Sequence, residues 1–533
     1  MNEENNRYKI VLTADRTLMS EYHGGIFLGF SACIPKGVIP DWIYFSMFCP
    51  SVETLENGAV KYAPYGTRKI EAALLKYGFE TDEIIVAHPE RLHKAIGPAT
   101  RVLGITENDP LGIGPATSTF TQLLGGQAYM AIKFKEILNH PSVKKYKPKV
   151  IVGGAGAWQL EPEHIRKELG VHCVVIGEGE EEAGPLFEKA VRGEQLPEVV
   201  YGEMVSEEKI PVIRNATIDG LVEIARGCGR GCRFCVPTLQ RLRCHPIEKI
   251  LQEIDVNLKA GRRPLLHAED VLRYKAKGIK IDKEAVIKLF KTVKAHPGVG
   301  AIGISHFALS SVAAAPDLVE EISGLLNVGK NGEWFSGQTG VETGSPRMIR
   351  KHMRGKCRPF APEEWPNMVL GAFEILAENN WVPCATLIVG LPEEKEKDID
   401  LTIQLVEELR PFKSLLVPLF YVAMGCMKDE TESFTMEKMT PKHGELIIKC
   451  WEHNLEWSKI LLKEYIVTRK FGVGYGIRLF LSYGINHVKK MLDICRREYN
   501  YDLKQMINDV RSGELDVTPR PIRIINKLIN MKH

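Results

Sequence analysis

Residues 221–235 read LVEIARGCGRGCRFC, an apolar run of strand character that leads directly into three cysteines spaced C-x3-C-x2-C. Glycine stands at positions 227, 229 and 231, around and between the first two cysteines. Glycine tolerates the left-handed conformations of a tight loop, so the backbone can wrap a compact group and aim its N–H groups at it. Three thiols on one loop after a strand predict a metal site with Cys228, Cys232 and Cys235 as ligands.

A four-iron, four-sulfur cluster suits this spacing better than zinc. Structural zinc sites close with four ligands, usually as two separated pairs, and the only adjacent candidate is Cys244-His245, at the start of a predicted helix. Three cysteines would leave one iron of a cubane cluster open. The other nine of the 12 cysteines are scattered singly, as expected of small buried side chains in a reducing compartment. We expect the cluster's negative charge to be offset by Arg226, Arg230 and Arg233.

The bulk composition describes a folded protein with more than one core. A chain of 533 residues is too long for one core, so two large domains and a smaller third are expected. The net charge of +3 gives no general attraction to nucleic acid or membrane. No apolar run is long enough to cross a bilayer, and the first residues, MNEENNRYK, are polar. We therefore expect a cytoplasmic location with no nucleic-acid or membrane partner.

Two successive alternations of strands and helices predict α/β architecture. The first spans residues 1–200, a polar connector covers residues 196–217, the second spans residues 218–425, and residues 430–533 are helical. In the first segment strands are expected at Ile84–Ala87, Arg101–Thr106, Lys149–Val152 and His172–Ile176, and helices at Thr121–Leu138 and Glu182–Val191. In the second, strands are expected at Leu221–Ala225, Pro264–His267, Ala301–Ser305, Gly337–Val341, Ala385–Val389 and Leu415–Phe420. The helices expected after residue 430 are Leu446–Thr468 and Ile477–Tyr499.

The second segment resembles the radical SAM superfamily. The cysteine spacing and the aromatic Phe234 before the last cysteine carry the resemblance, and three motifs continue it in order: HAED at 267–270, GVETGS at 340–345 and LIVGLPEE at 387–394. The resemblance covers about residues 221–425. It implies a cluster on the three cysteines and S-adenosylmethionine (SAM) at the open iron. The implied SAM-binding residues are Glu269, Ser305, His306, Gln338, Glu342 and Ile388.

The first segment resembles the cobalamin-binding domain of cobalamin-dependent radical SAM enzymes. The usual loop, Asp-x-His-x-x-Gly, here reads DPLGIG at 109–114, with Leu111 in place of histidine. Leucine cannot coordinate, so the resemblance implies cobalamin with its own base displaced and no histidine below the cobalt. The implied contacts are Asp109, Leu111, Gly112, Gly114, Thr117, Ser118, Thr119, Gly153, Gly154, Gly156, Gly177, Glu178 and Gly179.

Together the two resemblances imply a Rossmann-like cobalamin domain, a partial (β/α)6 radical SAM barrel and a C-terminal helical cap. The implied activity is methyl transfer from methylcobalamin to an unactivated sp3 carbon, after a SAM-derived radical removes hydrogen. Over most of its length the chain is similar to archaeal members of the group. The favoured substrate is a glutamine residue of methyl-coenzyme M reductase, modified after translation in a methanogen. The sequence assigns no catalytic side chain and no electron donor.

Three alternatives stay open. Within the class, the substrate is an archaeal lipid or a tetrapyrrole. A second alternative is methylthiolation of RNA, whose enzymes hold another cluster on three cysteines of the first domain. The placement of Cys33, Cys49 and Cys173 does not resemble that set. A third is a non-catalytic protein that holds cobalamin or a cluster, although a purely structural cluster normally takes a fourth cysteine.

Overall fold

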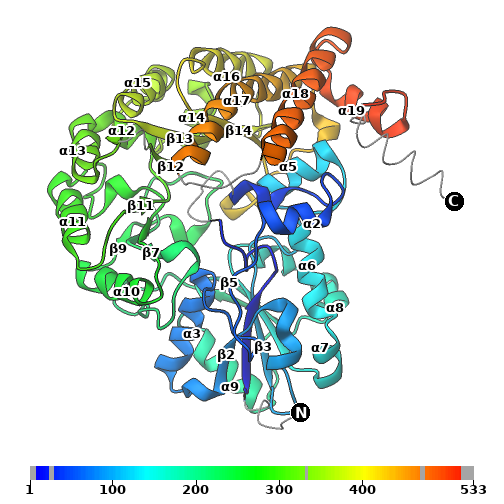
Figure 1. Cartoon of the computed structure of the whole chain (residues 1–533), viewed down its shortest axis with the longest axis vertical. Coiled ribbons are helices and arrows are strands. Elements are labelled where there is room, and N and C mark those ends of the chain that lie inside the picture. The colour runs from blue at the N-terminus through cyan, green and yellow to red at the C-terminus, as the bar shows by residue number, and fades with distance from the viewer. Residues whose placement is uncertain (1–7, 23–28, 331–333, 469–474, 518–533) are drawn as a thin grey trace.

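The computed structural model describes residues 8–22, 29–330, 334–468 and 475–517. A parallel sheet and a partial barrel of parallel strands, each covered by helices, lie beside each other, and a helical segment packs on the barrel (Figure 1). The α/β class expected from the sequence is confirmed.

The first domain is a six-stranded, all-parallel sheet in the order β2-β1-β3-β4-β5-β6. Its strands are β1 (Ile10–Ala14), β2 (Ile84–Val86), β3 (Val102–Thr106), β4 (Lys149–Gly153), β5 (Cys173–Gly177) and β6 (Val199–Gly202). Its helices are α2 (Asp41–Ile43), α3 (Tyr65–Tyr77), α4 (Leu92–Ala95), α5 (Pro115–Leu124), α6 (Tyr129–Leu138), α7 (Pro141–Tyr146), α8 (Glu163–Leu169) and α9 (Ala183–Val191). The strand order reverses between β1 and β3, and in open sheets ligands bind at the carboxyl ends beside such a point.

Three details of this domain differ from the sequence-based expectation. The fully buried strand β1 was not predicted, and the connector expected at 196–217 contains the edge strand β6. The single helix predicted at Thr121–Leu138 is two helices. Gly125 and Gly126, with φ of 78° and 82°, end α5, and the bridge between Pro35 and Ala128 precedes α6.

The second domain is a partial barrel of six parallel strands in two three-stranded halves. A parallel bridge between His306 and Gln338 joins the halves. The strands are β7 (Leu221–Glu223), β10 (Leu265–His267), β11 (Gly303–Ile304), β12 (Phe335–Glu342), β13 (Trp381–Val389) and β14 (Leu415–Phe420). The covering helices are α10 (Ile247–Lys259), α11 (Lys283–Ala295), α12 (Leu309–Ala314), α13 (Pro316–Leu326), α14 (Pro346–His352), α15 (Trp365–Glu378) and α16 (Glu396–Glu408). A short antiparallel pair, β8 (Ala225–Arg226) and β9 (Arg243–Cys244), flanks the cysteine loop.

The C-terminal segment is helical: α17 (Pro441–Thr468), α18 (Tyr475–Glu498) and α19 (Leu503–Ser512). Two parts of the segment expected at 430–533, residues 469–474 and 518–533, lie outside the described residues. Helix α17 covers the outer edge of β14, where Asn454 donates to Leu416 O and accepts from Leu416 N, each at 2.7 Å. Within the described residues no helix is both long and apolar enough to cross a membrane.

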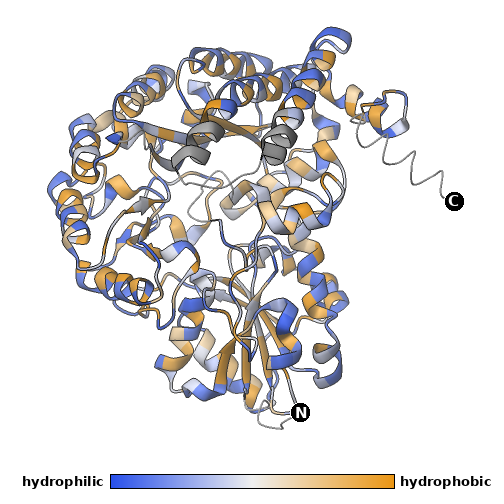
Figure 2. Cartoon of the chain, in the orientation of Figure 1, coloured by the Kyte–Doolittle hydropathy of each residue, from blue (hydrophilic) through white to orange (hydrophobic). Residues whose placement is uncertain are grey.

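The cores follow the sheets. One large cluster of buried side chains fills the barrel and extends to α17 and α19, and two clusters cover the two faces of the first sheet. Figure 2 shows the first sheet as hydrophobic strands between helices that turn polar residues outward. Buried strands of this kind are expected where helices cover both faces of a parallel sheet.

Candidate functional site

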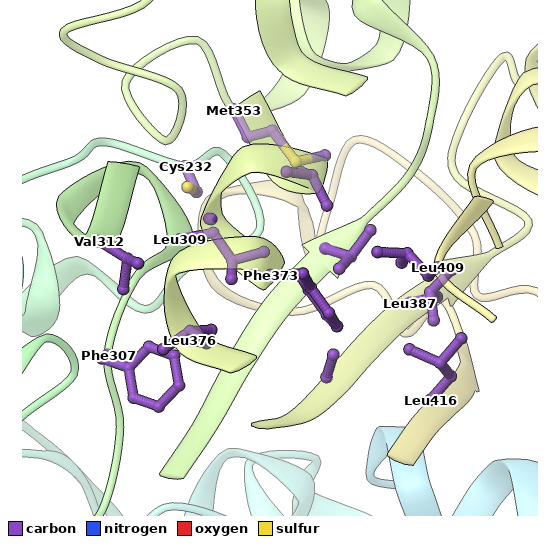
Figure 3. Close-up of a cluster of buried hydrophobic side chains, with 14 of the residues drawn as sticks. Cys232, Phe307, Leu309, Val312, Met353, Phe373, Leu376, Leu387, Leu409 and Leu416 are labelled. Carbon is purple, nitrogen blue, oxygen red and sulfur yellow. The ribbon is translucent and has the colours of Figure 1, made fainter. Parts of the chain in front are cut away.

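The three predicted ligand cysteines lie on the loop between β8 and β9. Gly227, Gly229 and Gly231 have φ of 74°, 69° and 67°, values that favour glycine. They allow the tight loop in which the backbone N–H of Cys235 donates to Cys232 O at 3.1 Å. All three thiols are free. Cys232 is buried at the edge of the barrel core, near Leu309 and Met353 (Figure 3), whereas Cys228 and Cys235 are half-buried.

The arginines beside the cysteines have carboxylate partners. Arg226 contacts Glu178 at 2.9 Å, Glu180 at 2.7 Å and Glu223 at 2.9 Å. Arg230 contacts Asp270 at 2.9 Å, and Arg233 pairs with Glu430 at 2.5 Å. Through these pairs the arginines anchor the cysteine loop to its surroundings. Their effect on the charge of a cluster stays a prediction.

The Arg226 cluster also joins the two domains. Glu178 follows β5 of the first sheet and accepts from Arg226 and Arg243, both beside the cysteine loop. Burial opposes ionisation of Glu223, yet Arg226 and His245 hold the pKa of its carboxyl well below the usual range. Glu178 was predicted to contact cobalamin; the structure uses both of its oxygens in this ionic junction.

A loop after α14, residues 353–358, holds the cysteine loop from the other side, and the sequence analysis assigned it no role. Arg233 N donates to His352 O at 2.9 Å, and the Arg230 guanidinium donates to Lys356 O at 3.1 Å. Gly355 packs so closely that a Cβ there would lie 1.8 Å from Arg230 O. The run RGK at 354–356 thus contains a glycine that this close approach requires.

The predicted SAM-binding residues of the middle strands lie together at the barrel mouth. His267 Nδ1 lies 2.9 Å from Ser305 Oγ, and the rings of His267 and His306 meet edge to face at 5.7 Å. Gln338 pairs with His306 across the two half-barrels. Burial lowers the pKa of His306 to about 3, so the ring is neutral at physiological pH. Ile388, on β13, is half-buried.

Two glutamates at the same barrel mouth differ in the partners of their carboxyl groups. Burial raises the pKa of Glu269 to about 7, and its Oε2 has no hydrogen-bond partner among the described residues. Glu342 adopts a positive φ of 60° at an irregularity of β12 and pairs with Lys356 at 2.7 Å. A carboxyl oxygen without a partner, beside free thiols, suits a ligand that brings its own hydrogen-bond donors, such as an ammonium group.

The 109–114 loop of the first domain is tied together internally. Asp109 Oδ1 accepts from the backbone N–H of Ile113 at 2.9 Å and of Gly114 at 3.0 Å, and Thr117 Oγ1 donates to Asp109 Oδ2. Gln159 donates to Asp109 at 2.8 Å and accepts from Leu111 N at 2.9 Å. The Leu111 side chain packs on the core of one sheet face. These predicted contacts therefore shape the loop.

Three further predicted contacts lie on α5, which reaches the barrel. Thr119 Oγ1 donates to Pro115 O at 2.6 Å and accepts from Phe420 N at 2.7 Å, at the end of β14. Ser118 Oγ accepts from Gln122 at 2.8 Å. Figure 1 shows α5 lying against the barrel side of the molecule. Thr117 and Thr119 are thus engaged within the protein, and Thr119 is a domain contact.

One cavity of about 780 Å³ connects the two sheet edges. Gly153, Gly154, Gly177, Glu178 and Gly179 of the predicted set line its first-domain side. The barrel side is lined by Glu269 and by residues 236–239, which follow Cys235 directly. Gly112, Gly114 and Gly156 are absent from its lining; a Cβ at these positions would collide with Ala128, Asp109 and Asn108 respectively. The cavity is the space in which a cofactor on the first domain would meet one on the cysteine loop.

The described residues contain no group of three His, Cys, Asp or Glu side chains that converges on a single metal ion. Thiolates that each bind a different iron of a cubane need not converge in that way. Free thiols on a glycine-rich loop, with no fourth cysteine on it, fit a four-iron cluster with one open position.

Comparisons with known proteins agree with this geometry. Two curated relatives are methylthiotransferases. The first, tRNA-2-methylthio-N(6)-dimethylallyladenosine synthase of Chlorobium phaeobacteroides, is 25% identical over a match that covers 54% of this chain and 62% of the relative. The ribosomal protein uS12 methylthiotransferase RimO of Thermotoga maritima is 31% identical over 36% and 41%. The match thus spans less than two thirds of either relative. The radical SAM methyltransferase TsrM of Kitasatospora setae, solved with cobalamin and a [4Fe-4S] cluster, is 13% identical with a TM-score of 0.50 over 79% of this chain and 77% of its own. Residues 222–406 match the model of the radical SAM superfamily, and in the structure they form most of the parallel barrel that carries the cysteine loop at its mouth.

Proposed function

We propose that this chain is a cobalamin-dependent radical SAM methyltransferase that acts on an unactivated sp3 carbon. The observation that carries the proposal is the single cavity lined both by the glycine edge of the first sheet and by the barrel's cysteine loop. The lining residues fit a cobalamin nucleotide tail, because Gly153 has no atom of another segment closer than 3.9 Å to a Cβ position and leaves the sheet edge open.

When bound, the cluster, SAM and cobalamin supply one-electron cleavage of SAM and a transferable methyl group. The chain's own residues bind and orient them. Cys228, Cys232 and Cys235 would hold three irons, and Glu269 would accept from the SAM ammonium. The ionic junction around Arg226 keeps the two sheet edges face to face. Leu111 offers no ligand to cobalt, which suits a cofactor that must release its methyl group.

The curated relatives favour a second candidate, methylthio transfer. Such enzymes need further cysteines for a second cluster in the first domain. Here Cys33, Cys49 and Cys173 belong to three separate buried clusters, so they do not form one ligand set. This separation supports methyl transfer.

For the substrate we propose a glutamine residue of methyl-coenzyme M reductase, on the resemblance of the sequence to archaeal members of the group. The test is anaerobic incubation of reconstituted enzyme with cobalamin, reductant, trideuteromethyl-labelled SAM and the glutamine peptide. Mass spectrometry follows 5′-deoxyadenosine and the peptide mass. Deoxyadenosine together with a labelled methyl group on the glutamine side chain is the expected result.

The other outcomes separate the alternatives. Deoxyadenosine without methylated peptide would remove this substrate and direct the same assay to archaeal lipids and tetrapyrroles. A labelled methylthio group would favour the second candidate. Neither product, from enzyme with an intact cluster whose spectrum SAM does not change, would indicate a non-catalytic binding protein.

A further inference from the structure

Lys356 is a partly buried cation held between the cysteine loop and the barrel mouth. Its ammonium group pairs with Glu342 at 2.7 Å, and only 17% of its side chain is exposed. Its backbone is fixed as well: Lys356 O accepts from Arg230 at 3.1 Å and from Ser310 Oγ at 2.7 Å. Arg230 stands midway between Cys228 and Cys232. The cation is therefore tethered to the cysteine loop itself.

Space for the Lys356–Glu342 pair is provided by Gly340. A Cβ at Gly340 would lie 1.9 Å from Glu342 Oε1 and 2.6 Å from Lys356 Nζ. The pair is therefore compact, and its cationic member is the one whose backbone is bonded to Arg230 of the cysteine loop.

We propose that Lys356 is a positioning residue that raises the reduction potential of the cluster and that Glu342 moderates this effect. The inference rests on the proposed function, since it concerns the cluster on Cys228, Cys232 and Cys235. Reduction adds one negative charge to the cluster, and a cation held in the same poorly solvated region stabilises that charge. The paired carboxylate partly cancels the cation, so the two residues act on the potential with opposite signs.

The test is an anaerobic redox titration of the reconstituted full-length chain, without SAM, followed by electron paramagnetic resonance of the reduced cluster. Lys356→Met should lower the midpoint potential by about 59 mV, which corresponds to a tenfold change in the one-electron reduction equilibrium. Glu342→Gln should shift it upward, and Lys356→Arg should stay near the wild type. Arg354→Met is the matched control, because Arg354 lies on the same loop with an exposed side chain.

The outcomes distinguish this inference from the proposed function. Failure of the wild-type chain to bind iron and sulfide would overturn the cluster, and with it both proposals. An intact cluster with equal potentials in Lys356→Met and wild type would overturn only the role of Lys356. Shifts of the same sign in Lys356→Met and Glu342→Gln would also overturn it, because general damage to the site moves both variants alike.

Discussion

The two sheets each place a glycine-rich loop after a strand, but the loops work in different ways. On the barrel, Cys228, Cys232 and Cys235 are free, and the surrounding arginines and backbone hold the loop in place. On the first domain, Asp109 and Thr117 bond to each other and to the loop backbone. One loop offers side chains to a ligand. The other uses its side chains for its own shape and leaves a ligand the backbone edge near Gly153.

The sharpest way to break this comparison is to remove one thiol. Cys232→Ala should abolish the cluster and all SAM cleavage, because no spare cysteine lies on the loop. Iron and sulfide content with the visible spectrum measures the loss. Cys426→Ala is the control, since this exposed thiol lies beside the loop without belonging to the predicted ligands. A full cluster in Cys232→Ala would mean that the ligands are assigned wrongly.

Next in size is the ionic junction that holds the two loops together. Arg226→Met leaves Glu178, Glu180 and Glu223 without their shared cation, and breaking a buried pair in this way costs about 3–5 kcal/mol. We expect urea unfolding to begin at clearly lower concentration, with early proteolysis between the domains. Arg192→Met, which removes an exposed pair with Glu188, should behave as wild type. Equal stability of the two variants would show that the junction contributes little.

The buried carboxyls at the reversal point of the first sheet should give a pH dependence. Burial raises the pKa of Asp15 to about 6, and burial with the nearby Asp15 raises that of Glu107 well above its usual range. The native state then binds more protons than the unfolded chain, so stability falls as pH rises from about 4 to about 6, by about 3 kcal/mol from Asp15. The measurement is urea unfolding across this range. Asp15→Asn should flatten the curve, and an unchanged slope would exclude Asp15 as its source.

A smaller effect is expected where the first sheet lines the cavity. Gly153→Leu would place a side chain in the open edge, and overpacking of about 1–3 kcal/mol corresponds to roughly a 5- to 150-fold loss of cobalamin affinity. Equilibrium titration followed by cobalamin absorbance measures it. Gly371→Ala on the remote helix α15 is the control, because it too has open space at Cβ. Unaltered affinity in Gly153→Leu would place the cofactor elsewhere.

The smallest expected effect concerns the contact of α5 with the barrel. Thr119→Val leaves the N–H of Phe420 buried without a partner, which costs about 1–3 kcal/mol. Hydrogen exchange of the Phe420 amide should become faster. Ser118→Ala, one residue earlier and bonded only within its helix, should leave that amide protected. Equal exchange in both variants would show that Thr119 does not hold the strand end.

How much of this was predictable differs between the same two loops. The strands that precede the cysteine loop, the HAED segment and the GVETGS segment could be predicted, because each is an apolar run that ends in motif residues. The motif residues are recognisable because a metal or cofactor site needs particular side chains. The edge strand β6, VVYG, lay in a segment that is polar overall. Gly125 and Gly126 signalled a helix break, but the apolar pattern on either side of them led to the prediction of one continuous helix. Arg226 and Lys356 illustrate the limit at the site, since which carboxylate a cation meets depends on tertiary contacts with no signal in nearby sequence.

The last strand of the barrel has a consequence for experiments in which the domains are expressed separately. The outer edge of β14 bonds to Asn454 of α17 at its start and to Thr119 of the first domain at its end. A barrel expressed without residues 1–200 would present part of an uncovered strand edge, and such edges pair readily with other chains. We expect the excised barrel to self-associate, whereas the intact chain supplies its own cover.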